Sequence, residues 1–333
     1  MKDLTYLTAD TADSAVELFA ATPGAQFLGG GTNLIDHLKL GVATPDALVD
    51  ISRIPLDRVE EYQDAIGSGL RIGSNVRNSD LAAHPVVRAS FPAVSRALLA
   101  GASGQIRNQA TTGGNLLQRT RCVYFQDVTT PCNKREPGTG CSALEGYGRH
   151  NAVLGASDAC VATHPSDLAV ALAALDASVV VLGPEGERRI ALDDLHRLPD
   201  DDPSIDTILE PGELITSVEL PRTAVAAQST YRKVRDRASF AFALVSVAAA
   251  LQVEGGRVSD VRIAWGGVAH KPWRARRAED WLRGRAITEQ TIRAAVAEEL
   301  TAARTNAQSV YKVPMLTNTT TLALLRLAEE VAQ

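Results

Sequence analysis

The sequence predicts an α+β fold in three parts, and three patterns in the chain indicate it. Strand-like and helical stretches alternate over residues 1–55, which is typical of a small parallel βαβ unit. From about residue 56, apolar and polar residues alternate between glycine turns, as in an antiparallel sheet. Two long apolar stretches and three helical patterns follow near the C-terminus. We therefore predict domains at residues 1–55, 56–222 and 223–333.

In the first part, each element has its own local signal. Residues 14–21 carry apolar side chains at helical spacing, and residues 25–28 form a short strand. A second helix is predicted over residues 32–41, where Gly41 ends it. Residues 47–52 form another buried strand, which completes a small parallel sheet.

The second part is predicted to combine an antiparallel sheet with helices. Residues 65–76 alternate as a strand with glycine turns. Helices are predicted over residues 86–103 and 166–177. Strands follow at residues 178–183 and 215–221, the last of which ends in proline.

The third part is predicted as an α+β domain with antiparallel strands and a three-helix bundle. Two strands within residues 239–269 are joined by a turn that contains Gly255 and Gly256. Helices are predicted around residues 274–283, 288–304 and 315–331.

Composition excludes several classes of function. The chain has 333 residues, 45% of them hydrophobic, and a net charge of −5 without a run of like charge. A nucleic-acid-binding protein needs a basic face, which this balance does not suggest. No apolar stretch reaches the roughly 18 residues that a membrane-spanning helix needs. The N-terminus also lacks a signal-peptide core. We expect the chain to stay where it is made unless a partner carries it across a membrane.

Two glycine-rich loops are the first candidate site. "FLGGGTNLI" begins at Phe27, and "ATTGGNLL" begins at Ala110. Backbone N–H groups in such a turn form an anion-binding concavity, and glycine lets a phosphate approach closely. Two loops of similar chemistry favour a dinucleotide whose pyrophosphate they hold from both sides. The alternative is that each loop is an ordinary tight turn. Neither a G-x-G-x-x-G motif nor a P-loop is present.

A cysteine-rich segment over residues 118–163 is the second candidate site. It holds all the cysteines, Cys122, Cys132, Cys141 and Cys160, among turn signals and little apolar periodicity. A long irregular segment needs a covalent or metal staple. Two disulfides, a zinc site and an iron–sulfur cluster all remain open. The spacing C-x9-C-x8-C-x18-C matches neither the short cysteine pairs of zinc sites nor the motifs of ferredoxins. The thiols alone therefore favour a zinc site and an iron–sulfur cluster about equally.

Over essentially its whole length, the chain resembles the flavin subunit of the molybdenum hydroxylases, the family of xanthine dehydrogenase, carbon monoxide dehydrogenase and aldehyde oxidoreductase. The ordered pair "GGGTNLI" and "TTGGN", the stretch "HPSDL" and the C-terminal part carry this resemblance. "NLLQRTRCVYFQDV…PCNKREPGTGC" is similar to the subset of periplasmic-type bacterial aldehyde oxidoreductases whose flavin subunit also holds a [4Fe-4S] cluster.

The resemblance implies FAD as a cofactor. The residues that it implies as FAD contacts are Phe27, Leu28, Gly29, Gly30, Gly31, Thr32, Asn33, Leu34, Thr111, Thr112, Gly113, Gly114, Asn115, Asp167, Ile215 and Lys233. Without the resemblance, the sequence predicts Asp167 to be a carboxylate at a helix N-terminus, Lys233 to be a solvated charge and Ile215 to be a core residue.

The resemblance also ranks iron–sulfur ahead of zinc for the four cysteines. Arg119, Arg121, Lys134 and Arg135 are then candidates to offset thiolate charge, although ordinary solvated charge accounts for most of them. His164 is predicted to be a surface residue.

In the family picture this chain holds no catalytic residue for the organic substrate. The resemblance implies a heterotrimer with a molybdenum-cofactor large subunit and a [2Fe-2S] small subunit, in which FAD passes electrons to an external acceptor. Ferredoxin, quinone, oxygen and NAD remain open, and the extra cluster favours an acceptor other than NAD. Location follows the partner: periplasmic if a signal-bearing subunit exports the complex, and otherwise cytoplasmic. Two rivals are a zinc-stapled nucleotide-binding scaffold and a stand-alone FAD reductase that uses NADH.

Overall fold

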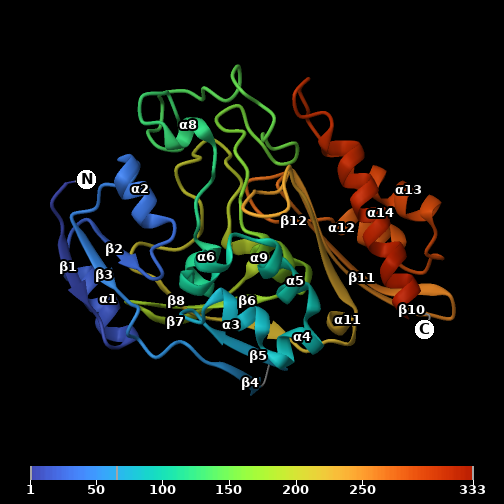
Figure 1. Cartoon of the computed structure of the whole chain (residues 1–333), viewed down its shortest axis with the longest axis horizontal. Helices are drawn as coiled ribbons and strands as arrows, with labels where there is room; N and C mark the ends of the chain where they lie inside the picture. Colours follow the sequence, from blue (N-terminus) through green and yellow to red (C-terminus); the bar gives the residue numbers. More distant parts are fainter. Residues whose placement is uncertain (1, 65–66, 332–333) are drawn as a thin grey trace.

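The computed structural model describes residues 2–64 and 67–331, which form three β-sheets (Figure 1). Ala65 and Ile66, at the start of a predicted strand, lie outside the described residues. The strands are β1 (Thr5–Thr8), β2 (Ala25–Leu28), β3 (Ala47–Asp50), β4 (Val59–Gln63), β5 (Ser68–Gly73), β6 (Ser178–Gly183), β7 (Gly186–Ala191), β8 (Leu214–Pro221), β9 (Ser229–Val234), β10 (Val245–Glu254), β11 (Arg257–Gly266) and β12 (Trp273–Arg274).

Helices cover the sheets, and the cysteine-rich segment crosses the top of the molecule with one short helix, α8 (Figure 1). The helices are α1 (Ala12–Ala21), α2 (Leu34–Leu40), α3 (Asn78–Ala83), α4 (Pro85–Ser90), α5 (Pro92–Ala100), α6 (Gly104–Gln109), α7 (Thr112–Leu116), α8 (Val123–Gln126), α9 (Asp167–Ala174), α10 (Leu192–Leu195), α11 (Ala224–Ala227), α12 (Arg276–Leu282), α13 (Glu289–Glu299), the 3₁₀ helix η1 (Leu300–Ala302) and α14 (Lys312–Val331).

The first sheet is parallel, as predicted. Its order is β1-β3-β2, and both outer strands run parallel to β3. Thr11 caps α1 by accepting a hydrogen bond from the Ser14 N–H at 3.1 Å. Gly41 ends α2 in the left-handed conformation, with φ of 73°. Local caps therefore fix where both helices of this unit begin and end.

The second sheet is antiparallel, as predicted, with the order β4-β5-β8-β6-β7. Its two edge strands were absent from the sequence prediction. β4 ("VEEYQ") and β7 ("GERRIA") are mostly exposed and carry charged residues, so they lack the apolar alternation of a half-buried strand. Edge strands tolerate such residues because charge there discourages pairing with other chains.

A single helix over residues 86–103 was predicted, and this prediction is wrong. The chain forms α4 and α5 instead, with a break at Phe91 (φ −141°, ψ 54°). Pro92 starts the second helix because proline has no N–H, suits a first turn and pushes the residue before it out of helical geometry. The second helix then packs against β9 and α9.

The C-terminal sheet has the order β12-β11-β10-β9 and includes the two predicted long strands, β10 and β11. The three predicted helices, α12, α13 and α14, follow in the chain. Gly255 and Gly256, in the turn between β10 and β11, have φ of 56° and 74°, as a type I′ hairpin turn requires. The last helix begins at Lys312, before the predicted start, because Pro314 is tolerated within a first helical turn.

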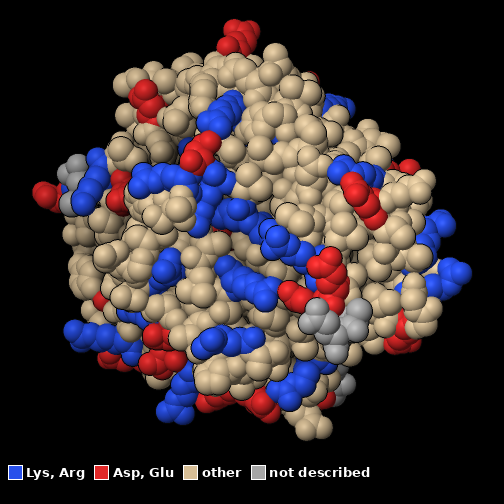
Figure 2. Space-filling model, turned by 45° about the vertical axis from the view of Figure 1, so that its right-hand side comes forward, with Lys and Arg blue, Asp and Glu red and all other residues tan. Residues whose placement is uncertain are grey.

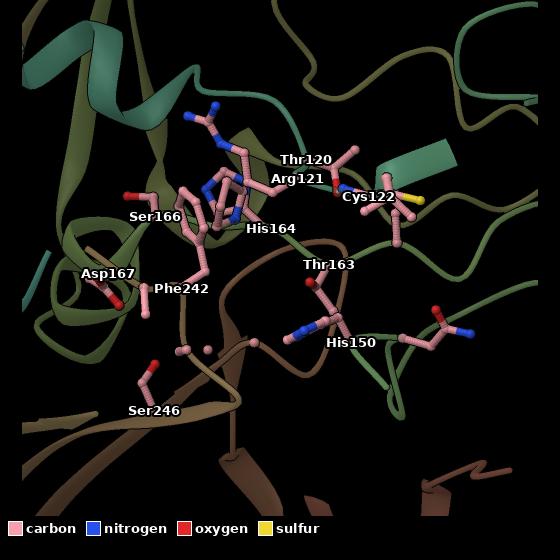
Figure 3. A pocket seen from close by; sticks show the side chains of 18 of the residues that line it. Thr120, Arg121, Cys122, His150, Thr163, His164, Ser166, Asp167, Phe242 and Ser246 are labelled. Atoms are coloured by element: carbon pink, nitrogen blue, oxygen red, sulfur yellow. The ribbon is translucent and has the colours of Figure 1, made fainter. Parts of the chain in front are cut away.

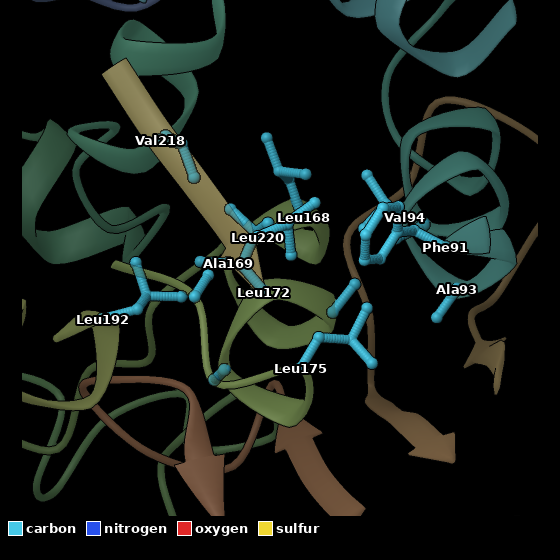
Figure 4. Packing of buried hydrophobic residues seen from close by; sticks show 14 of the residues in the cluster. Phe91, Ala93, Val94, Leu168, Ala169, Leu172, Leu175, Leu192, Val218 and Leu220 are labelled. Atoms are coloured by element: carbon cyan, nitrogen blue, oxygen red, sulfur yellow. The ribbon is translucent and has the colours of Figure 1, made fainter. Parts of the chain in front are cut away.

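Helix α9 forms the centre of the core (Figure 4). All of its residues are buried, and it packs against α5, β10 and β11. Leu168 and Leu172 lie between Phe91 on one side and Leu220 of β8 on the other. The helix therefore holds Asp167, its first residue, at a fixed place beside the C-terminal sheet. Among the described residues, no helix is both long and apolar enough to cross a membrane.

Candidate functional site

The first glycine loop, residues 29–34, offers a row of free donors. It leaves β2 and enters α2, and Gly31 has a φ of 73°. Within the described part of the chain, none of the backbone N–H groups of residues 29–34 has a hydrogen-bond acceptor. Neighbouring unpaired N–H groups form a concavity that suits an anion, because an unsatisfied donor is costly unless a ligand or water accepts from it.

The glycines of this loop also allow close packing between the two loops. A Cβ on Gly30 would lie 2.2 Å from the carbonyl oxygen of Gln109, just before the second loop. A Cβ on Gly29 would lie 3.1 Å from the Thr111 hydroxyl oxygen. A side chain at position 30 would therefore force the two loops apart, whether or not a ligand is bound.

The second loop has most of its donors occupied. The Thr112 N–H donates to the Val76 carbonyl at 2.9 Å, and the Gly114 N–H donates to the Thr111 hydroxyl at 3.2 Å. The sequence predicted that both loops hold an anion through backbone N–H groups. In the structure, the first loop presents the free N–H row and the second loop supports it.

Two adjoining cavities run along these loops. The glycine-loop cavity has a volume of about 460 Å³, and the Asp167 cavity has a volume of about 200 Å³. Both have Thr32, Asn33 and Gly114 in their walls. Predicted site residues that line one or both cavities are Phe27, Leu28, Gly29, Gly30, Gly31, Thr32, Asn33, Leu34, Thr111, Gly113, Gly114, Asn115, Asp167, Ile215 and Lys233.

Thr112 is the predicted site residue that lies apart from both cavities. It is fully buried, and its hydroxyl donates to the Val76 carbonyl at 3.0 Å. Its part is to anchor the second loop.

Asp167 and Lys233 are partners of each other. The Lys233 Nζ lies 2.7 Å from Asp167 Oδ2, and their side chains are 3% and 9% exposed. The Tyr231 hydroxyl donates to Asp167 Oδ1. Burial, followed by the nearby Asp167 charge, raises the pKa of Tyr231 well above its usual value. Lys233 is therefore no solvated charge, and the pair presents polar atoms to the cavity at nearly zero net charge.

Breaking this pair is expected to destabilise the fold. Asp167→Asn leaves the Lys233 ammonium buried without a counter-charge, which costs about 3–5 kcal/mol of unfolding free energy. The double variant Asp167→Asn/Lys233→Met removes both charges and is expected to lose less. Urea unfolding of the unchanged protein, the single variant and the double variant measures these losses of unfolding free energy. A loss below about 1 kcal/mol in the single variant would show that solvent reaches the ammonium.

A third cavity, here called the histidine chamber, adjoins the Asp167 cavity. Its volume is about 330 Å³, and Arg121, Asp167 and Phe242 line both spaces. Figure 3 shows Arg121 and His164 beside the Phe242 ring, with His150 across the chamber. The Arg121 guanidinium lies 5.1 Å from the centre of that ring. His164 was predicted to lie on the surface, but it is half-buried, and burial lowers its pKa well below the usual value.

Aromatic residues 240 and 242 are site components that sequence reasoning missed. Phe240 has φ of 52°, and both rings are exposed beside the Asp167 cavity, at 59% and 47%. A non-glycine residue with positive φ is uncommon and marks a constrained segment. The signal in the sequence was "SFAF", which was assigned to a strand although β10 begins only at Val245.

The four cysteines are free thiols, so the disulfide interpretation has no support in the structure. Cys132 and Cys141 face each other across an isolated antiparallel bridge. A hydrogen bond from the Cys160 thiol lowers the pKa of Cys141 to about 6, whereas burial raises the pKa of Cys122. Among the described residues, no group of three or more His, Cys, Asp or Glu side chains is arranged to hold a metal ion.

The cations near the cysteines are held by the protein and are not simply solvated. Lys134 is 3% exposed and pairs with Asp206, which Arg119 also contacts at 2.6 Å. The two cations lower the pKa of Asp206 to about 2 in spite of its burial. Arg135 donates to backbone carbonyls of the segment, including that of Tyr124. These contacts give the irregular segment a defined shape without help from the thiols.

Family models match most of the chain. Residues 2–223 match the model "FAD binding domain in molybdopterin dehydrogenase", and residues 229–326 match "CO dehydrogenase flavoprotein C-terminal domain".

Curated relatives and solved structures give the same picture. The chain is 56% identical over 280 residues to the aldehyde oxidoreductase FAD-binding subunit PaoB of Escherichia coli (strain K12), covering 84% of this chain and 86% of that protein. It is 26% identical to the glyceraldehyde dehydrogenase medium chain of Sulfolobus acidocaldarius, covering 87% and 85%. The fold matches a carbon monoxide dehydrogenase structure from Hydrogenophaga pseudoflava with TM-score 0.74 and 25% identity, covering 97% and 96%.

Proposed function

The chain belongs to the family of FAD-binding subunits of molybdenum hydroxylases, and from this premise we propose that it is the electron-transfer subunit of an aldehyde-oxidising complex. In this proposal it binds FAD, receives electrons that partner subunits remove from an aldehyde, and passes them to an external acceptor. The names of two relatives, an aldehyde oxidoreductase subunit and a glyceraldehyde dehydrogenase chain, support the aldehyde substrate.

The observation that carries the FAD proposal is the row of unpaired N–H groups over residues 29–34. It lies in the wall of the glycine-loop cavity, which adjoins the Asp167 cavity. This arrangement suits an extended ligand such as FAD, with its pyrophosphate at the glycine loop and its flavin ring toward the Asp167 cavity. Asp167 would accept hydrogen bonds from ribityl or ring atoms. Asn115 would accept or donate them, and Ile215 would contact an apolar face of the ligand.

The protein's contribution is binding and orientation, since flavin chemistry supplies the ability to accept two electrons and release them onward. The buried Asp167–Lys233 pair fixes polar atoms in the cavity wall without adding net charge. The Phe242 ring and the Arg121 guanidinium, which lies 5.1 Å from the centre of that ring, form part of the wall of the Asp167 cavity. No acid–base residue for the organic substrate is needed on this chain.

Partner subunits complete the proposed complex. Relatives of the chain are named as medium chains or subunits of multi-subunit enzymes. We propose a heterotrimer with a molybdenum-cofactor large subunit that oxidises the aldehyde and a [2Fe-2S] small subunit that passes electrons to FAD.

A [4Fe-4S] cluster on Cys122, Cys132, Cys141 and Cys160 is a further part of the proposal. Support comes from the confinement of four free thiols to one segment and from the backbone bridge that sets Cys132 opposite Cys141. Thiolates at this position would lie near the Lys134 ammonium. Its positive charge acts to lower the pKa of Cys160 and so favours the thiolate. The alternative is a zinc-stapled nucleotide-binding scaffold without redox activity.

Co-purification of the complex, followed by flavin and metal analysis, tests the proposed function. We expect one FAD per chain and an absorption band of oxidised flavin that bleaches when an aromatic aldehyde is added without oxygen. A colourless preparation with one zinc per chain would favour the scaffold instead. Flavin that stays oxidised with aldehyde, while a chemical reductant bleaches it, would contradict the role in electron transfer.

A further inference from the structure

A strongly basic groove lies between α5, β9 and α14, and the FAD proposal gives it no role. We call it the arginine groove because Arg96, Arg232 and Arg326 line it, one from each element. Its volume is about 600 Å³. Figure 2 shows Lys and Arg side chains gathered across the middle of this face, although the whole chain carries a net charge of −5.

The three guanidinium groups have too few counter-charges among the residues that the structure describes. Arg96 donates to the Thr230 hydroxyl at 2.6 Å, and in the described residues none of the three forms an ion pair. Burial, followed by the charges of Arg326 and Arg96, lowers the pKa of Arg232, and Glu330 is the carboxylate that opposes this. Holding like charges together costs free energy, so the groove suits an anionic partner that offsets the repulsion.

The lining indicates the kind of partner. Leu322, 42% exposed, is the exposed large apolar side chain in the groove, beside polar residues such as Asn318. Permanent subunit interfaces are apolar at their centre and poor in charge. A charged, polar surface instead suits a transient protein partner that electrostatic attraction steers into place. An acidic protein face fits this groove better than an obligate subunit does.

The groove is also next to the proposed flavin site. Lys233, which pairs with Asp167, lines both the arginine groove and the Asp167 cavity. Strand β9 therefore forms the wall between them, and a protein seated in the groove lies one strand away from the cavity.

We propose that the arginine groove docks the acidic face of a soluble one-electron carrier protein, which takes electrons from the bound flavin. This inference rests on the proposed function. Oxidation of one reduced flavin supplies two electrons and two protons. Two oxidised carrier molecules take one electron each, and the protons pass to solvent.

The experiment compares three electron acceptors with the aldehyde-reduced complex at low ionic strength. Acidic plant plastocyanin and basic mitochondrial cytochrome c are one-electron protein acceptors of opposite charge, and 1,4-benzoquinone is an uncharged small acceptor. The test variant is R96E/R326E, which changes two exposed side chains. The matched control R53E/R304E changes the net charge equally at exposed positions outside the groove and the three cavities.

We expect R96E/R326E to lower the second-order rate constant for plastocyanin at least about tenfold and to flatten its dependence on salt. Cytochrome c is expected to react faster with this variant, benzoquinone reduction and flavin content to stay unchanged, and R53E/R304E to have a much smaller effect. Equal plastocyanin rates in the unchanged complex and R96E/R326E, with benzoquinone reduction intact, would overturn the docking proposal alone. A decrease in the plastocyanin rate constant of R53E/R304E as large as that of R96E/R326E would also overturn the docking proposal alone. Failure of the unchanged complex to reduce any acceptor would overturn the proposed function and this inference with it.

Discussion

The Gly30→Val protein is expected to fold but to bind flavin at least about tenfold more weakly than the unchanged chain, which corresponds to 1.4 kcal/mol or more of binding free energy. The physical reason is the contact between the two loops. A side chain at this position would place its Cβ 2.2 Å from the Gln109 carbonyl oxygen, so the first loop must move away from the second. That movement disturbs the row of unpaired N–H groups, on which the proposed pyrophosphate contact depends.

Flavin content per folded protein, with circular dichroism as the check on folding, measures this effect. Gly104→Val is the matched control, because a Cβ there meets nothing within 4 Å and no positive φ is required. Full flavin occupancy in Gly30→Val would mean that the cofactor binds elsewhere. If instead the variant fails to fold, Gly29→Ala, whose Cβ has a milder contact of 3.1 Å with the Thr111 hydroxyl, tests the same loop.

Cys132→Ser is expected to remove about four irons per complex and to leave FAD in place. A [4Fe-4S] cluster needs four thiolate ligands, and a serine hydroxyl is a poor replacement. The glycine loops lie outside the cysteine-rich segment, so flavin binding has no reason to change. The same result is expected when Cys122, Cys141 or Cys160 is replaced.

Iron, zinc and flavin analyses of the purified complex decide between the interpretations. Thr129→Ala, an exposed position in the same segment, is the matched control for general damage. Unchanged iron in all four cysteine variants would refute cluster ligation. Loss of one zinc, with iron unchanged, would instead establish the zinc site that remained open for these four thiols.

Local sequence signals predicted most of the elements that hold the site. The parallel first sheet, the long β10–β11 hairpin and the C-terminal helices are present, because caps, glycine turns and apolar periodicity act over a few residues. The strands β4 and β7 escaped prediction because edge strands need no apolar alternation. The break at Phe91 was missed because the apolar pattern continues across Pro92. The domain boundaries stay a prediction.

The sequence by itself determined the family, the positions of both glycine loops and the confinement of the thiols to one segment, since each of these is a feature of consecutive residues. Only the tertiary structure decided which groups meet. It paired Lys233 with Asp167, 66 residues away, and set Gly30 against Gln109. It also gathered arginines from three elements into one groove. Periodicity reports which side of an element is buried, whereas packing of distant segments decides what that side touches.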